Sequence, residues 1–285
     1  MSKVVLLLGT MKINPSHFGA FGELMRGKVQ SFDILHPGVW FGPELEKQEG
    51  IRLKSVDELG ELQFLCEHLK CGDFSIRSRL QELIVSCRDA SVRKQAIRLY
   101  CYTARHQDVA FVYNLLEELD HDDILTVVVT APDTLSPEVV PYLFTLLGEY
   151  GEVSISQDIL SSIDRVFPWG YVGGEVDLIG LSEKFSGFAK SLVTGAYYYG
   201  GALAHPGSLC KALIEAVAQS RHSKRKFPLA NAPTLLSVWS GEKCPVFYGQ
   251  DVDDRCMQDV MGYVNRIASL QWDAGRKYFY KHIVE

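Results

Sequence analysis

A helical repeat in the middle of the chain is the feature that most limits what this protein can fold into. Apolar residues recur there at the spacing of one helix face, as in Val92, Ala96 and Leu99. A shift of 31 residues aligns the segment 108–119 with the segment 139–150, and most of their apolar positions coincide. A single helix pair of this kind cannot bury its apolar face alone, so neighbouring pairs stack. The sequence therefore predicts a stack of helix pairs.

The helical period of the apolar residues and the glycine- and proline-rich breaks divide the chain into three predicted segments. Residues 1–73 combine a short apolar strand, Val4–Leu8, with glycine- and proline-rich turns and form an irregular N-terminal cap. Residues 74–167 hold the helical repeat. Residues 168–285 begin with the helix-breaking sequence Pro168–Gly174 and continue as a helical C-terminal region. The helices expected along the chain cover 18–26, 55–69, 75–87, 92–104, 108–119, 124–131, 139–150, 156–167, 183–199, 209–220 and 251–272.

The repeat segment resembles HEAT-type arrays, in which helix pairs follow one another along the chain and stack. The resemblance covers residues 74–167. The expected fold class is mostly α: a HEAT-like stack of antiparallel helix pairs with a small irregular N-terminal cap. The resemblance implies a surface that binds another protein, and leaves the identity of that protein open. At the far end, the aromatic tail Gly275–Ile283 is expected to be a strand or a docked chain end.

Acidic residues are concentrated in the same part of the chain. Residues 106–183 hold 15 acidic residues and one basic residue, Arg165, whereas residues 1–105 and 184–285 each carry a net positive charge. A surface of one sign raises the rate of association with an oppositely charged partner by roughly 10 to 10³ and repels the phosphates of nucleic acid. The block therefore predicts either a solvated acidic face or a surface for a basic protein. Nucleic acid is not expected as the partner.

The cysteines and histidines show no metal-binding pattern. The seven cysteines are irregularly spaced with no Cys-x-x-Cys pair, and the histidines form no His-x-x-x-His pair. We therefore expect reduced thiols in the core, no metal and no cofactor. The longest early apolar run, Val4–Leu8, is far shorter than the ~20 residues of a membrane span. No cleavage site follows this run, so a cytoplasmic chain is expected.

Two segments support alternatives in which the chain is an enzyme. The N-terminal strand followed by Asn14–Gly19 resembles the His-x-Gly-His motif of nucleotidyltransferases, which implies a nucleotide-binding transferase using His17. Ala20 replaces the second histidine, and the chain lacks the strand–helix alternation of that fold. The stretch His205–Cys210 holds His, Ser and Cys, which a turn before a helix explains more simply. The basic stretch 221–226 lacks interleaved aromatic residues and is expected to be a solvated loop.

In length, acidity and expected location, the chain resembles bacterial immunity proteins, which neutralise a cognate polymorphic toxin. Such proteins are often single chains of this size and are commonly acidic against basic toxins. The resemblance implies a non-enzymatic scaffold whose acidic central face binds a basic protein, with the toxin domain as that protein. The residues expected to bind the partner lie at or just past helix ends in adjacent repeats: Glu117, Glu118, Asp120, Asp122, Asp123, Glu149 and Glu152.

Overall fold

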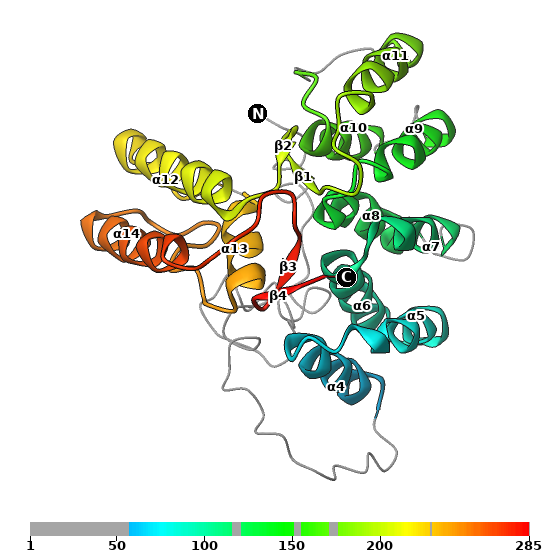
Figure 1. Cartoon of the computed structure of the whole chain (residues 1–285), viewed down its shortest axis with the longest axis horizontal. Coiled ribbons are helices and arrows are strands. Elements are labelled where there is room, and N and C mark those ends of the chain that lie inside the picture. Colours follow the sequence, from blue (N-terminus) through cyan, green and yellow to red (C-terminus); the bar gives the residue numbers. More distant parts are fainter. Residues whose placement is uncertain (1–56, 116–120, 151–154, 171–175, 229, 285) are drawn as a thin grey trace. The chain divides into compact units, whose positions relative to one another are not determined.

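The computed structural model of this chain is mostly α-helical, as the sequence predicts (Figure 1). It describes residues 57–115, 121–150, 155–170, 176–228 and 230–284. These residues contain eleven α-helices, labelled α4–α14, and two antiparallel hairpins of two strands each. The predicted strand Val4–Leu8, the predicted helix 18–26 and the residue His17 lie outside the described residues. No helix in the described part of the chain is long and apolar enough to cross a membrane.

The described residues form two compact units, and we treat each separately. The first, which we call the central unit, comprises residues 74–204 together with Val284. The second, which we call the C-terminal unit, combines residues 57–73 with residues 205–283. These units follow contacts in space. The division into 1–73, 74–167 and 168–285 follows the order of the chain and stays a prediction.

The central unit is a succession of helices that closes with a short hairpin. Its inner helices pack in series: α8 lies between α6 and α10, while α5 covers α6 and α9 covers α10 (Figure 1). The helices predicted over 92–104, 139–150 and 156–167 are confirmed to within two residues at each end. The elements are η1 Phe74–Ile76, α5 Arg77–Ser86, α6 Ala90–Thr103, η2 His106–Asp108, α7 Val109–Asn114, α8 His121–Thr130, η4 Ala131–Thr134, α9 Val139–Tyr150, α10 Ser156–Val166, α11 Leu178–Ala189, β1 Tyr198–Tyr199 and β2 Ala202–Leu203.

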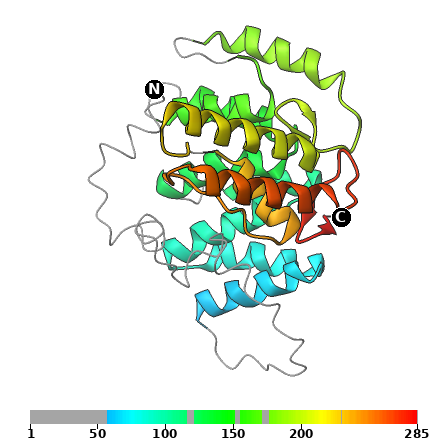
Figure 2. The ribbon, with the colours of Figure 1, turned by 90° about the vertical axis from the view of Figure 1, so that its left-hand side faces the viewer.

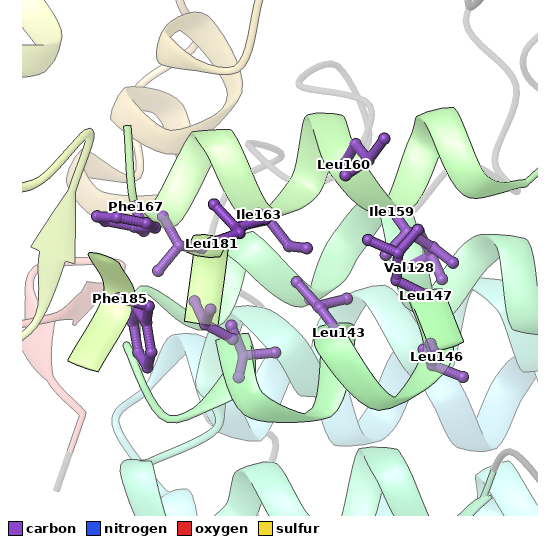
Figure 3. Close-up of a cluster of buried hydrophobic side chains, with 14 of the residues drawn as sticks. Val128, Leu143, Leu146, Leu147, Ile159, Leu160, Ile163, Phe167, Leu181 and Phe185 are labelled. Atoms are coloured by element: carbon purple, nitrogen blue, oxygen red, sulfur yellow. The ribbon is translucent and has the colours of Figure 1, made fainter. Parts of the chain in front are cut away.

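The apolar faces of α8, α9 and α10 meet in one buried core (Figure 3). Val128, Leu143, Ile159 and Ile163 each have an exposed fraction of 1% or less. Phe185 of α11 adds its ring to the same cluster. Burying an apolar side chain of this size stabilises the fold by about 1.5–3 kcal/mol. The regularly spaced apolar residues that predict these helices are therefore the same residues whose burial stabilises their packing.

The C-terminal unit is built around α12, which packs against both α13 and α14. Figure 2 shows α12 and α14 lying side by side. The helix α13 is absent from the sequence-based prediction, and the reason is its burial. Eight of its nine residues are buried, and a helix buried all round shows no one-sided apolar pattern. The elements are α4 Glu58–Lys70, α12 Pro206–Ser223, α13 Ala232–Ser240, α14 Asp254–Ala268, β3 Tyr278–Phe279 and β4 His282–Ile283.

Several helices predicted along the C-terminal half differ from the observed ones in extent; the helix expected over 251–272, for example, covers only Asp254–Ala268. The helix expected over 183–199 begins earlier, at Leu178, because Asp177 caps its amino end. It ends at Ala189, where the amides of Ser191 and Leu192 bond to carbonyls three residues back and tighten the chain into turns. The basic stretch expected as a loop begins inside α12, which continues to Ser223 and ends at Lys224 in a left-handed conformation. Cations at the carboxyl end of a helix interact favourably with its dipole, which accounts for this extension.

The aromatic tail, predicted as a strand or a docked chain end, forms the hairpin β3–β4, which has the same construction as the hairpin β1–β2. In each, a tyrosine hydroxyl accepts a hydrogen bond from a backbone amide five residues earlier. The amide of Val193 lies 2.7 Å from the Tyr198 hydroxyl, and the amide of Asp273 lies 2.9 Å from the Tyr278 hydroxyl. Each turn then uses two residues with positive φ, which suits a tight hairpin. They are Gly200 and Gly201 in the first hairpin and Tyr280 and Lys281 in the second.

Each hairpin turn also caps the end of a helix in its own unit. The amide of Gly200 donates to the carbonyl of Arg165 in the last turn of α10, at 3.3 Å. The amide of Tyr280 donates to the carbonyl of Val238 in the last turn of α13, at 2.7 Å. The last carbonyls of a helix have no partner within the helix. The turns therefore satisfy acceptors that the helices leave open.

Candidate partner-binding surface

The structure describes three of the seven predicted partner-binding residues. Asp122 is the second residue of α8, Asp123 follows it, and Glu149 lies in the last turn of α9. The remaining four, Glu117, Glu118, Asp120 and Glu152, lie outside the described residues. The two aspartates thus lie at the start of α8, and the glutamate lies at the end of α9.

Asp123 and Glu149 have opposite environments. The side chain of Asp123 is fully buried, and its Oδ2 lies 2.7 Å from Nε of Arg93 on α6. Glu149 is exposed to solvent. A buried carboxylate that is paired within the fold presents no charge to a partner. Of these two residues, only Glu149 has a charge that a partner can reach.

Several acids of the acidic block pair with arginines about one repeat away in sequence. Asp123 pairs with Arg93 at a separation of 30 residues. Asp133 is buried, and its Oδ1 lies 2.7 Å from Nη2 of Arg165, 32 residues away. Asp108 lies 3.8 Å from Nη1 of Arg77, which precedes it by 31 residues. Arg77 and Arg93 belong to the basic segment 1–105, so the charge imbalance along the sequence is partly neutralised inside the fold.

Other acids of the block close helix ends or are buried. Asp177 caps α11 by accepting from the amide of Ile179 at 3.1 Å. Asp164 accepts from the amides of Trp169 and Gly170, both at 3.1 Å, and so orders the chain after α10. Burial raises the pKa of Asp158, which lies in the first turn of α10. Among the acids of this block whose side chains are described, the exposed ones are Glu138, Glu149, Asp177 and Glu183.

A charged cluster around Asp108 was not anticipated by sequence reasoning. Arg105 donates to both carboxylate oxygens of Asp108, at 2.9 and 3.0 Å. Burial acts to raise the pKa of Asp108, but the hydrogen bonds from Arg105 outweigh it and hold the pKa below its ordinary value. The Arg77 guanidinium donates to the carbonyl of Thr103 at 3.0 Å. Burial and then the like charge of Arg105 lower the pKa of Arg77. The repeat spacing of 31 residues between Arg77 and Asp108 is the signal in the sequence that points to this cluster.

The segment His205–Cys210 is the start of a helix, and the simpler prediction of a turn before a helix is confirmed. The ring Nδ1 of His205 accepts from the amide of Gly207 at 3.0 Å, and Pro206 is the first residue of α12. Burial raises the pKa of the Cys210 thiol to about 11, so the thiol is protonated at neutral pH. A helix cap and a protonated, buried thiol do not form a nucleophile–base pair.

Metal and membrane sites are not evident in the described residues. No three His, Cys, Asp or Glu side chains there gather closely enough to hold a metal ion. All seven cysteines are unbridged; six are buried and Cys71 is exposed. The charged features described in this part of the chain are the exposed acids of the acidic block and the cluster around Asp108.

Comparisons with known proteins give one match. Curated proteins and solved structures give no significant match to the chain. The model of the Immunity protein 47 family matches residues 38–284 of the 285-residue chain, and the protein therefore belongs to this family.

Proposed function

We propose that this protein neutralises its cognate toxin by binding it directly through an acidic surface. Membership of the Immunity protein 47 family implies toxin neutralisation and a cognate toxin as partner. Immunity proteins of this kind are typically non-enzymatic, and on that ground the expectation of a non-enzymatic chain is confirmed. The family match gives no support to the alternative, a nucleotide-binding transferase at His17.

The position of Glu149 is the observation that supports an acidic contact surface. Glu149 is exposed and lies in the last turn of α9, where no basic residue is present. The carboxyl end of a helix carries partial negative charge, so an acid there destabilises the helix by about 0.3–1 kcal/mol. The charge of Glu149 therefore does not stabilise α9. An interaction with a basic surface of the toxin would give this charge a role.

We propose that the predicted residues around two helix ends act together with Glu149. Glu152 follows α9 in sequence, Glu117, Glu118 and Asp120 precede α8 in sequence, and Asp122 is its second residue. Asp123 is not part of this proposed surface, because its carboxylate is buried against Arg93. The proposed partner is a toxin domain with a basic face.

We also propose that the helices of the central unit form a HEAT-like repeat. The serial packing of α6, α8 and α10 supports it. Contacts between residues one repeat apart support it further. Besides the three ion pairs, the ring of Tyr113 stacks on that of Tyr142 with 4.3 Å between centroids, and His106 lies 2.8 Å from the Ser136 hydroxyl. Such a repeat would place successive helix ends along one edge.

Binding to the cognate toxin tests the proposal, and the product of the neighbouring gene is the first protein to try. The purified chain and toxin are titrated by calorimetry at 50 and 300 mM salt. We expect tight binding that weakens with salt, because screened charges contribute to it. Neutralising Glu117, Glu118, Asp120, Asp122, Glu149 and Glu152 to the corresponding amides should weaken binding by about 10- to 100-fold at low salt, at about 0.2–0.5 kcal/mol for each charge removed.

The matched control is Glu183→Gln, which removes an exposed acid of the same block from the middle of α11. This variant should bind within about twofold of the unmodified chain. The chain could bind the toxin while the variant with all six substitutions binds it as tightly as the control does. In that case the proposed acidic surface would be incorrect, although toxin binding itself would stand. If the chain neither binds nor protects cells against the toxin, the function itself is wrong.

A further inference from the structure

We propose that an exposed basic and aromatic surface of the C-terminal unit contacts an acidic segment of the cognate toxin. The surface comprises Lys224, Arg225 and Phe247, and we call it the basic–aromatic surface. All three residues belong to the C-terminal unit. This inference rests on the proposed function, because it names a second contact with the same partner.

The basic stretch 221–226 carries positive charge that the fold leaves without a partner. It holds four Lys and Arg residues and no acid, and all six of its residues are exposed. Two of the four basic side chains form ion pairs with aspartates of the segment 251–254. The other two, Lys224 and Arg225, form no ion pair with any residue that the structure describes. Their charges are therefore available to carboxylates of another protein.

The backbone at Lys224 indicates that this lysine is not present for the sake of stability. Lys224 ends α12 in the left-handed conformation, with a φ of +50°. Glycine is the usual residue at such a helix end, because a side chain is strained there. Arg221 and His222 already place cations in the last turn, where they can interact with the helix dipole. A contact between the lysine side chain and a partner accounts for the strain.

The structure supplies the aromatic side chain that the basic stretch lacks in the sequence. Phe247 is 45% exposed, although it is a large apolar residue. The turn that carries it is bonded to Phe227, the residue that follows the basic stretch. The Phe227 amide donates to the Gln250 carbonyl at 2.8 Å, and the Gly249 amide donates to the Phe227 carbonyl at 3.0 Å. The aromatic turn and the basic stretch are therefore neighbours in the C-terminal unit.

Hydrogen bonds within the turn hold Phe247 in place before any partner binds. The Gln250 amide donates to the Phe247 carbonyl at 3.2 Å, and the Phe247 amide donates to Oε1 of Gln250 at 3.1 Å. Gly249 has a φ of +79°, which such a tight turn requires. Nε2 of Gln250 also lies 3.7 Å from Sγ of Cys256, which is buried. A ring on an ordered turn loses little conformational entropy on binding, and aromatic residues of this kind often dominate an interface.

The charges around the surface favour a protein segment over nucleic acid. Asp251 and Asp254 are exposed and lie 3.7 and 2.5 Å from cations of the basic stretch. These aspartates would repel the regularly spaced phosphates of a nucleic-acid strand. A protein segment can instead place single carboxylates beside the two unpaired cations and an apolar side chain against the phenylalanine ring. An acidic toxin segment therefore fits the surface best.

Titration of the toxin into variants of the surface, followed by calorimetry, provides the test. Phe247→Ala removes the ring and should weaken toxin binding about 10- to 30-fold, as truncation of an aromatic interface residue does. The matched control is Met261→Ala, because Met261 is also a large apolar residue of this unit and is 39% exposed. The control should bind the toxin within about twofold of the unmodified chain.

A double variant, Lys224→Gly with Arg225→Gln, separates binding from stability. Glycine suits the left-handed helix end, so the Tm should stay unchanged or rise. Toxin binding should weaken about 3- to 20-fold at 50 mM salt, and the loss should shrink at 300 mM salt because the charges are screened. Lys211→Gln is the control, since it removes a lysine of α12 whose side chain is 79% exposed. This control should bind within about twofold of the unmodified chain.

The outcomes separate this inference from the proposed function. If the toxin binds the unmodified chain, Phe247→Ala and the double variant with equal affinity, the basic–aromatic surface is not a contact, although neutralisation by binding stands. An oligothymidylate strand serves as the nucleic-acid probe. Affinity for this strand that is lost in the same variants, with toxin affinity unchanged, identifies a nucleic-acid surface and also overturns the inference. If the toxin fails to bind the unmodified chain, the proposed function fails on its own evidence, and the inferred contact fails with it.

Discussion

Arg93 and Asp123 form an ion pair between α6 and α8, with Nε of the arginine 2.7 Å from Oδ2 of the aspartate. The aspartate side chain is fully buried, and the arginine side chain is 20% exposed. The two residues are 30 positions apart, close to the 31-residue shift at which the sequence repeats. Asp123 belongs to the densest acidic run of the sequence, yet its charge is used to join two helices.

Asp123→Asn should destabilise the protein by about 2–4 kcal/mol, because removing one partner of a buried ion pair leaves the other charge poorly compensated. The lower end reflects the partial exposure of Arg93. Urea unfolding at pH 7 measures the change in the free energy of unfolding. Glu149→Gln, at an exposed position, should stay within about 0.5 kcal/mol of the unmodified chain. A variant that keeps full stability but loses toxin affinity would instead place Asp123 in the binding surface.

Asp158→Asn should stabilise the protein at pH 7, by on the order of 1 kcal/mol. Burial raises the pKa of Asp158 above its ordinary value of 3.8, although the first turn of a helix favours a carboxylate. The folded chain therefore holds this proton at pH values where the unfolded chain has released it. Stability is lost as the pH rises from 3.8 through the raised pKa, and asparagine avoids that loss.

Unfolding of both proteins between pH 3 and pH 7 checks the sign of this effect. The advantage of Asp158→Asn should be present at pH 7 and vanish below pH 3.8. Asp164→Asn serves as the contrasting variant, because Asp164 accepts two backbone hydrogen bonds and should lose stability when neutralised. An advantage that grows toward low pH would contradict the assignment to Asp158.

Gly201→Ala should cost more stability than Gly200→Ala, although the two glycines are neighbours in one turn. Both have positive φ, +76° and +55°, which costs an alanine about 1–2 kcal/mol. A Cβ on Gly201 would also lie 2.7 Å from Cγ of Pro168, whereas a Cβ on Gly200 would meet no atom within 4 Å. We expect losses of about 2–4 and about 1 kcal/mol, respectively. Equal losses measured by thermal unfolding would show that the hairpin moves away from Pro168 at no cost.

Much of the helical fold could be predicted because it depends on local signals. Asp89 and Asp177 immediately precede helices, and their side chains accept hydrogen bonds from backbone amides of the first turn. Such caps involve only residues that are neighbours in sequence. The apolar stripe that includes Val92 and Ala96 is buried as its spacing indicates. The helix α13 escaped prediction because it is buried on all sides and has no polar face to reveal its period.

The candidate site was less accessible to prediction, because exposure is not a local property. The acidic block is visible in the sequence, but the identity of the acids that reach solvent depends on arginines about 30 positions away. Asp123 is buried in an ion pair with Arg93, and Asp133 is buried in an ion pair with Arg165, whereas Glu149 is exposed. No pattern within the acidic segment distinguishes these three residues.

The sequence by itself determined that the chain is helical, that its helices pair through one-sided apolar faces, and that negative charge gathers in the middle. These properties follow from the 3.6-residue period and from composition, which need no knowledge of distant contacts. Only the tertiary structure decided which charged residues form ion pairs with one another. It also decided that Arg77, Arg105 and Asp108 line one pocket. The reason is that a charge buried by a neighbouring repeat is stable only when an opposite charge from that repeat is beside it.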